Sequence, residues 1–292
     1  MAPDQINITS PLLSLTVSAL GAEMQSLQDA RGQEWLWQGD PAYWSGRAPL
    51  LFPIVGRAPE NRIAVGPHSA EMAQHGFARR TMFHLAQQAP DMCCFVLEDS
   101  AQTRAVYPFA FRLSVTYRLD GAALTTTVAV ENRSATPMPF GFGFHPAFAW
   151  PLPGAAGRPH RVTLANGGAP AMARLRDGLL PPERLPSPFA DGMLTLSEGL
   201  FDADAMIFPE GAGEALSYGV EAGPGLSFRF DNLPNLALWS KPGAAFLCVE
   251  PWHGMAAQSG AGPQIADRPF STTLAPQAVA RFGYSVTVQD AA

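Results

Sequence analysis

The chain has 292 residues, of which 47% are hydrophobic and only 15% are charged, with 28 prolines and 27 glycines. This length can bury a large core, and the composition excludes a disordered or fibrous protein. The net charge of −6 and the presence of a single lysine, Lys241, argue against binding to nucleic acid or to an anionic membrane surface.

Short segments rich in β-branched and aromatic residues occur along the whole chain, and glycine, proline, asparagine or aspartate separates one segment from the next. This pattern predicts many short strands joined by turns. The clearest are residues 111–119 and 122–130, which flank Asp120-Gly121 and predict a β-hairpin with a type I′ turn. Further strands are predicted at residues 12–19, 93–98, 161–165, 226–230, 236–239, 245–250 and 280–288.

Helical periodicity is almost absent, so the strands are not linked as βαβ units. We therefore predict an all-β fold, a large antiparallel β-sandwich. Residues 151–188 are rich in proline, glycine and alanine, but strands of the same character continue on both sides. We interpret this segment as an elaborated loop, and the chain as a single domain over residues 1–292.

The N-terminal residues MAPDQINITSPLLSLTVSAL contain Asp4 and lack the basic segment of a secretory signal. No apolar run reaches the roughly 18 residues that a membrane span requires. The cysteines Cys93, Cys94 and Cys248 have neither disulfide nor metal-ligand spacing, which is typical of buried residues in a reducing compartment. We expect a cytoplasmic protein that does not bind membranes.

The first candidate for chemistry is His145 in FGFHPAF, an imidazole among three phenylalanines. Pro146 removes a backbone donor and favours extended geometry at His145, so the side chain is expected at the end of a strand. Apolar neighbours make the pKa of an imidazole sensitive to its partners, which suits proton transfer near neutral pH. A hydrogen-bonded core histidine would show the same pattern, and both interpretations stay open.

The second candidate is Glu250 in FLCVEPWHG. Strand alternation places Phe246, Cys248 and Glu250 on one face, so a carboxylate ends an otherwise apolar row. Pro251 and Trp252 then add rigidity and an aromatic surface of the kind that packs against sugar rings. Glu250 is a candidate acid or base, and a solvated strand end is the alternative.

Two further candidates come from the first third of the chain. His75 in QHGFAR precedes Gly76, which permits backbone conformations or a close approach that other residues do not. Arg57 begins RAPENR, in which it and Arg62 are either surface charges or planar forks for oxygen ligands. The residues alone do not choose between these roles.

The chain contains, in order, LLFPIVGR (50–57), QHGFAR (74–79), FGFHPAF (142–148), FDADAMIF (201–208), LALWS (236–240) and CVEPWHG (248–254). This series, which spans nearly the whole chain, resembles the aldose 1-epimerase (galactose mutarotase) family and especially its LacX-like branch. The resemblance implies a supersandwich of mostly antiparallel strands with a monosaccharide on its concave face, and it implies an isomerase.

The resemblance also implies roles for single residues. His145 is expected to be the general acid that protonates the pyranose ring oxygen, and Glu250 the base that takes the proton from the anomeric hydroxyl. His75 is expected to be a second catalytic imidazole on the ring-oxygen side. Arg57 and Asp204 match positions that bind sugar hydroxyls, with Asp202 as a competitor of Asp204 because strand periodicity places both on one face. From their own chemistry, Arg79 and Trp252 are also expected to bind the substrate.

Anomer interconversion requires one proton to leave O1 and one to reach the ring oxygen, which a matched acid and base accomplish together. We therefore expect no metal and no organic cofactor. Three alternatives remain: an epimerase for hexose 6-phosphates, a non-catalytic sugar-binding or sensor protein, and a metal-dependent hydrolase using both histidines and the glutamate. The first would need a cationic pocket built from Arg62, Arg79, Arg80 or Arg104. The identity of the sugar and the oligomeric state stay open.

Overall fold

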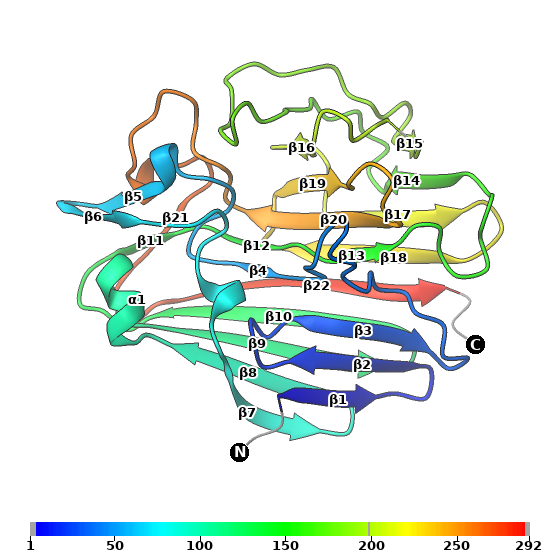
Figure 1. The fold of residues 1–292 in the computed structure, drawn as a ribbon, viewed down its shortest axis with the longest axis horizontal. Helices are drawn as coiled ribbons and strands as arrows, with labels where there is room; N and C mark the ends of the chain where they lie inside the picture. The colour runs from blue at the N-terminus through cyan, green and yellow to red at the C-terminus, as the bar shows by residue number, and fades with distance from the viewer. Residues whose placement is uncertain (1–3, 198, 290–292) are drawn as a thin grey trace.

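The computed structural model describes residues 4–197 and 199–289. Two antiparallel sheets dominate the architecture, and a three-stranded sheet and two two-stranded sheets accompany them (Figure 1). The strands are β1 (Gln5–Thr9), β2 (Leu13–Ser18), β3 (Met24–Asp29), β4 (Leu50–Leu51), β5 (Arg62–Val65), β6 (His68–Glu71), β7 (His84–Ala89), β8 (Met92–Glu98), β9 (Phe111–Asp120), β10 (Ala123–Asn132), β11 (Met138–Phe140), β12 (Phe142–Phe144), β13 (Ala147–Ala149), β14 (His160–Leu164), β15 (Met193–Thr195), β16 (Met206–Phe208), β17 (Ala215–Val220), β18 (Gly225–Asp231), β19 (Asn235–Trp239), β20 (Phe246–His253), β21 (Thr272–Leu274) and β22 (Val279–Gln289).

The described helical segments are short, as the lack of helical periodicity predicts. They are the α-helix α1 (Ala101–Val106) and the 3₁₀ turns η1 (Pro59–Asn61), η2 (Ala78–Arg80) and η3 (Ile265–Asp267). Among these residues no helix has the length and apolar character needed to cross a membrane. The prediction of an all-β, antiparallel sandwich is confirmed.

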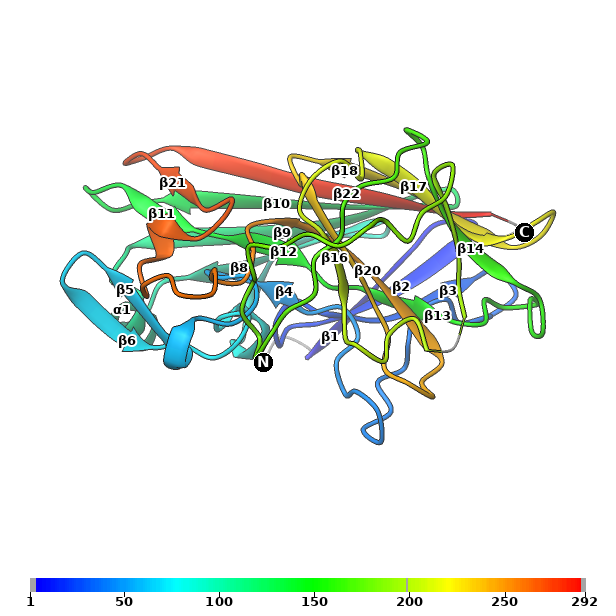
Figure 2. The same cartoon turned by 90° about the horizontal axis from the view of Figure 1, so that it is seen from above.

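The large sheet has the order β15-β14-β17-β18-β22-β10-β9-β8-β7, and the small sheet has the order β16-β19-β20-β12-β4, with β13 also paired to β20. Figure 2 shows β4, β12 and the sheet β1-β2-β3 on the same side of β10 and β22. The two-stranded sheets are the hairpin β5-β6 and the pair β11-β21, whose strands are distant in the sequence. The large sheet therefore has one face covered by the smaller sheets, and its other face is open to solvent.

Strand alternation explains which side chains form the core. In β9 the residues at 111, 113, 115, 117 and 119 are buried and their neighbours are more exposed. In β20, Leu247 and Val249 join the same apolar cluster from the opposite layer. This cluster includes residues from Ile6 to Val288, so both ends of the described chain contribute to it.

The predicted hairpin forms, but its turn lies one residue further along the chain. Asp120 pairs with Ala123, so the two loop residues are Gly121 and Ala122. Gly121 has a φ of 53°, and Ala122 is not among the residues of positive φ. A type I′ turn needs positive φ at both loop positions, so the predicted turn type was wrong.

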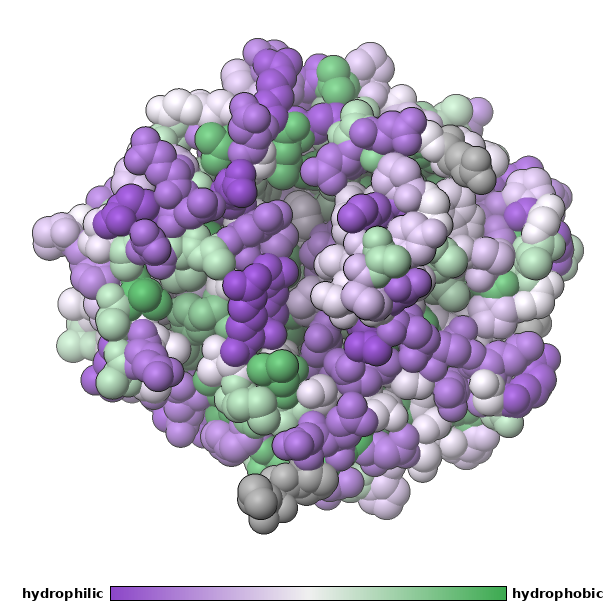
Figure 3. Space-filling view, in the orientation of Figure 1, coloured by the Kyte–Doolittle hydropathy of each residue, from purple (hydrophilic) through white to green (hydrophobic). Residues whose placement is uncertain are grey.

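Segment 165–192, between β14 and β15, forms no regular strand and folds over the small sheet through isolated bridges from Ala173 to Ile207 and from Leu180 to Gln258. The sequence predicted one loop over residues 151–188, and the structure divides that range with the short strand β14. The face of the molecule seen in Figure 3 is mostly hydrophilic, with hydrophobic residues scattered over it. The loop supplies one wall of the cavity described next.

Candidate active site

A cavity of about 310 Å³ lies on the face of the small sheet that points away from the main core. Its size is at the lower end of the roughly 300–1,000 Å³ typical of small-molecule pockets. The lining residues are Trp44, Gly56, Gln74, His75, Arg79, His145, Leu175, Asp204, Ala205, Ile207, Trp239, Glu250, Trp252 and Ala256. Segments from six separate parts of the chain therefore meet there.

Strand register places His145 opposite Glu250. Two short strands, β12 and β13, both pair with β20, and His145 and Pro146 form the interruption between them. Gly143 faces Trp252 and Ala147 faces Cys248, so the same register sets the histidine against the glutamate. The Nε2 atom of His145 lies 3.2 Å from Oε2 of Glu250. The proline thus ends a pairing at the position that the sequence predicts, and the side chain faces a cavity.

Glu250 is not at the end of its strand as predicted, because β20 continues to His253. Alternation nevertheless holds: Leu247 and Val249 point into the main core, and Phe246 and Cys248 pack in an aromatic cluster on the cavity side with Trp37. Glu250 is only 2% exposed. A buried carboxyl is costly unless it is paired, and His145 is its partner.

Burial disfavours the charged form of both partners. It raises the pKa of the Glu250 carboxyl well above its usual value, and the nearby Asp204 adds a smaller effect in the same direction. It lowers the pKa of His145 to about 3. Burial therefore favours a protonated carboxyl beside a neutral imidazole over the ion pair of carboxylate and imidazolium.

His75 is held as a neutral hydrogen-bond donor. Its Nδ1 accepts the backbone N–H of Gly56 at 3.0 Å, so the ring proton resides on Nε2. The side-chain nitrogen of Gln74 lies 3.2 Å from that Nε2 atom, and because both groups are donors this contact leaves the Nε2–H without an acceptor there. Burial lowers the pKa of His75 well below its usual value, and the neighbouring His145 and Arg79 lower it further. The ring stands edge-on to His145, with 5.7 Å between centroids.

The backbone at His75 explains the glycine that follows it. His75 has a φ of 67° and Gly76 a φ of 73°, and a Cβ at Gly76 would lie 2.1 Å from the carbonyl oxygen of Phe52. The sequence predicted a special conformation or a close approach at Gly76, and the structure shows both. This tight turn aims the imidazole of His75 into the cavity.

Of the expected substrate-binding residues, Asp204, Arg79 and Trp252 line the cavity. Arg79 comes from η2, and its buried Nε has no hydrogen-bond partner within the described part of the chain. Trp252 donates its indole N–H to the carbonyl of Phe144 at 3.2 Å. Asp202 lines a different cavity, because 201–204 is a turn and not a strand, so the two aspartates do not share a face.

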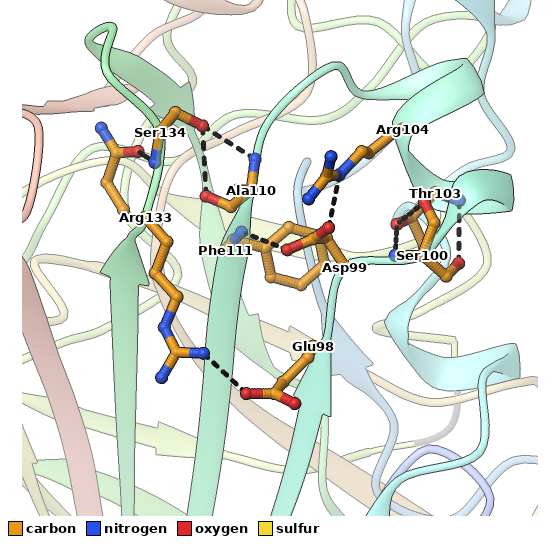
Figure 4. A network of polar contacts seen from close by, with 10 residues as sticks. Glu98, Asp99, Ser100, Thr103, Arg104, Ala110, Phe111, Arg133 and Ser134 are labelled. Carbon is orange, nitrogen blue, oxygen red and sulfur yellow. Dashed lines mark hydrogen bonds and ion pairs between the residues drawn. The ribbon is translucent and has the colours of Figure 1, made fainter.

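Arg57 is not among the lining residues of this cavity. Its side chain is exposed and its Nη1 donates to the carbonyl of Asp177 at 3.4 Å. Arg62 donates to Ser69 on the β5-β6 hairpin. Arg104 pairs with Asp99 at 2.5 Å, beside the capping residues of α1 (Figure 4). The arginines considered for phosphate binding therefore do not converge, and Arg79 is the one that lines the cavity.

Sequence reasoning missed two tryptophans beside His145. Trp44 stacks on the imidazole, with centroids 5.0 Å apart and planes at 29°, and Trp239 meets it edge-on at 5.7 Å. LALWS carries Trp239, but nothing in the segment showed which way its ring points. Trp44 lies in a turn-rich segment between β3 and β4, where no periodic pattern indicates its direction.

A larger cavity of about 700 Å³ has no comparable chemistry. Its histidine, His160, is satisfied by the backbone: Nε2 accepts from Leu152 N–H at 3.0 Å and Nδ1 lies 2.9 Å from the carbonyl of Arg158. Its lysine, Lys241, donates to the carbonyl of Tyr43 at 3.1 Å. The smaller cavity is therefore the candidate active site.

One group near the site has ligand atoms of the kind that bind metals. A ring nitrogen of His145, Sγ of Cys248 and a carboxylate oxygen of Glu250 lie within 4.8 Å of one another. A thiol must lose its proton to bind a metal, and burial raises the pKa of Cys248 well above its usual value. Cys248 also does not line the cavity. We assign no metal to this group, and it differs from the predicted hydrolase set because His75 is not part of it.

The chain matches known proteins along its length. A family model described as aldose 1-epimerase matches residues 4–168. The plasmid and chromosomal LacX proteins of Lactococcus lactis subsp. lactis are 29% identical to this chain over 295 residues, which cover 97% of this chain and 99% of LacX.

Solved structures show the same similarity. A galactose mutarotase related enzyme from Lactobacillus acidophilus has a TM-score of 0.92 and 29% identity, with 98% of each chain covered. A galactose mutarotase-like protein from Lactobacillus casei ATCC 334 has a TM-score of 0.88 and 26% identity, with 98% of this chain and 100% of that chain covered.

Proposed function

The chain belongs to the aldose 1-epimerase family, and on that premise we propose that it interconverts the α and β anomers of a free aldose. The observation that carries the proposal is the His145–Glu250 pair, whose reacting atoms lie 3.2 Å apart in the wall of a cavity of about 310 Å³. An acid and a base held together are what hemiacetal opening requires.

The proposed reaction begins from the ion-paired form of the pair. The Glu250 carboxylate takes the proton from O1, C1 and O1 form the carbonyl, and the bond between C1 and the ring oxygen breaks. The electron pair of that bond stays on the ring oxygen, which takes the proton from Nε2 of His145. After rotation about C1–C2, the reverse steps close the ring on the other face of the carbonyl.

Ring opening leaves Glu250 protonated and His145 neutral, which is the form that burial favours. The pair carries one proton before and after the reaction, so no proton is exchanged with solvent during a turnover. Burial therefore supports ring opening, and ring closure, in which Glu250 returns its proton to O1 and His145 takes the hydroxyl proton, restores the starting form. Each group is expected to contribute roughly 10²–10⁴-fold to the rate.

The other lining residues suit a neutral polyol. The Nε2–H of His75 is a fixed donor that can bind the ring oxygen, which makes it a positioning group and not a proton donor. Arg79 supplies donors and Asp204 acceptors for hydroxyl groups, and Trp252 supplies an apolar surface. We propose no role for Arg57 in binding.

We favour a free sugar over its 6-phosphate as the substrate. A phosphate group is recognised by converging cations, and Arg62 and Arg104 are engaged on other parts of the surface. Inorganic sulfate should therefore leave the rate unchanged at moderate concentration. Competitive inhibition by sulfate would support the phosphosugar alternative instead.

We also propose a reducing compartment, the cytoplasm, for this reaction. Cys93, Cys94 and Cys248 are free thiols, and Cys248 lies directly beside the catalytic pair. A thiol in that position is compatible with the chemistry as long as it stays reduced.

The decisive experiment is anomer exchange by NMR at equilibrium, with a panel of aldoses and their 6-phosphates. Acceleration by the wild type and its loss in Glu250→Gln would support the proposal and rank the substrates. Binding of a sugar without accelerated exchange would contradict it and favour the sensor alternative.

A further inference from the structure

The indole of Trp44 is packed against the catalytic imidazole and enclosed by other aromatic rings. It stacks on His145 with 5.0 Å between centroids, and Trp239 meets it edge-on at 5.3 Å and 89°. Phe246 lies against it at 5.6 Å. The Trp44 carbonyl accepts the indole N–H of Trp37 at 2.8 Å, which anchors the backbone of this segment. The ring therefore has little freedom to move.

A glycine makes room for this ring. A Cβ added at Gly46 would lie 2.6 Å from Cζ2 and 2.8 Å from Cε2 of Trp44. Gly46 does not have a positive φ, so its conformation is open to any residue and the approach of the indole is what excludes a side chain. His145, Trp239 and Phe246 pack around the indole, so a methyl group at position 46 would force the indole away from the imidazole of His145.

We propose that Trp44 is a positioning residue, held by Gly46, that orients the imidazole of His145 and stabilises its protonated form. The electron-rich face of an indole attracts a cation, and the attraction is stronger where water is excluded. The stack also covers one face of the imidazole, so the ring presents its Nε2 edge to Glu250 and the cavity. The expected effect of Trp44 on kcat rests on the proposed function. The stacking of Trp44 on His145 and its effect on the titration of His145 do not.

Several charged or titratable groups share this environment and act on His145 at the same time. They are Glu250 and Cys248 on β20, His75 before η2, Arg79 in η2, and Asp204, which acts on Glu250. The substitution used as a test must leave all of them in place. Gly46→Ala does so, because Gly46 does not line the cavity.

The test compares Gly46→Ala with Gly262→Ala, whose added Cβ would meet nothing within 4 Å and whose φ is not positive. In the wild type, the ring protons of His145, assigned by their loss in His145→Gln, should resonate upfield because of the stacked indole. Gly46→Ala should remove that upfield shift, and Gly262→Ala should keep it. The pH at which these resonances titrate should fall by about one unit, because the protonated imidazole loses a stabilising face.

The kinetic readout separates positioning from binding. Gly46→Ala should lower kcat about tenfold with little change in KM, because the imidazole then carries the proton in a smaller fraction of the molecules. Trp44→Leu, which keeps Gly46, is the second variant should Gly46→Ala fail to fold, and it should behave in the same way. Trp44→Phe, which keeps an aromatic face, should fall between Trp44→Leu and the wild type.

Unchanged ring-proton shifts and an unchanged titration of His145 in Trp44→Leu would overturn the inference. If the wild type accelerates no aldose, the proposed function fails, but the NMR titration still decides whether Trp44 stabilises the protonated imidazole. A fall in kcat with an unchanged titration of His145 would show that Trp44 only packs the site, and this would also overturn the inference.

Discussion

His145 and Glu250 are neighbours across β20 although 105 positions separate them in the sequence, and their Nε2 and Oε2 atoms lie 3.2 Å apart. The relationship follows from register: β12 and β13 pair with β20 on either side of His145 and Pro146, so a change of one residue in pairing would turn the glutamate to the other face. The sheet itself therefore holds the proposed acid and base together.

The first prediction concerns the base. Glu250→Gln keeps the shape of the side chain but cannot take a proton, so the rate of anomer exchange should fall roughly 10²–10⁴-fold while sugar binding persists. Exchange measured by NMR and binding measured by calorimetry test the two parts. The control is Glu221→Gln, because Glu221 is exposed and pairs only with Arg161 at the surface. Equal rates for both variants would remove Glu250 from the mechanism.

The second prediction concerns stability and pH at Glu250. Its pKa in the folded protein is raised by burial, so above the ordinary pKa of about 4.5 the folded state binds a proton that the unfolded state has lost. The free energy of unfolding therefore falls as pH rises through this window. Glu250→Gln has no such group and should gain stability relative to the wild type between about pH 5 and about pH 8 in urea unfolding.

The third prediction concerns His145, for which the free energy of unfolding changes with pH in the opposite direction. The pKa of His145 is lowered to about 3 by burial, so below the ordinary value of 6.5 the unfolded state takes up a proton that the folded state refuses. This contribution to stability is present above pH 6.5 and is lost as pH falls. His145→Gln should therefore gain stability relative to the wild type between about pH 7 and about pH 4, and a constant difference would contradict the assignment.

The fourth prediction isolates the close approach at Gly76. Gly76→Ala and Gly32→Ala both place an alanine at positive φ, 73° and 75°, but only the first brings a Cβ to 2.1 Å from a backbone atom, the carbonyl oxygen of Phe52. Gly32→Ala should cost about 1 kcal/mol, and Gly76→Ala about 1–3 kcal/mol more. Chemical denaturation measures both. Anomer exchange should fall in Gly76→Ala alone, since His75 precedes it.

The fifth prediction chooses between the two aspartates. Asp204 lines the candidate active site, and Asp202 lines the larger cavity. Asp204→Asn should raise KM for the aldose, because one acceptor for a hydroxyl group becomes weaker, and Asp202→Asn should leave it unchanged. Steady-state anomer exchange decides this, and a raised KM in Asp202→Asn alone would reverse the assignment.

Local patterns predicted the strands because the alternation of buried and exposed side chains is a property of the extended chain itself. Phe111 to Leu119 is such a case, and the pairing of β9 with β10 is as predicted except at the turn. The turn was misplaced because Asp120-Gly121 and Gly121-Ala122 both contain the glycine that allows positive φ. Glu250 was likewise assigned to a strand end because Pro251 resembles a strand terminator, yet β20 continues through it.

By itself the sequence determined an antiparallel all-β chain, and it pointed to two histidines and a glutamate as the candidate acid, base and second imidazole. The tertiary structure alone decided that Asp204 and not Asp202 lines the candidate active site, that Arg57 lies outside it, and that Trp44 covers His145. The physical reason is that a strand imposes a period of two on its side chains, whereas turns have no period and take their direction from what packs against them.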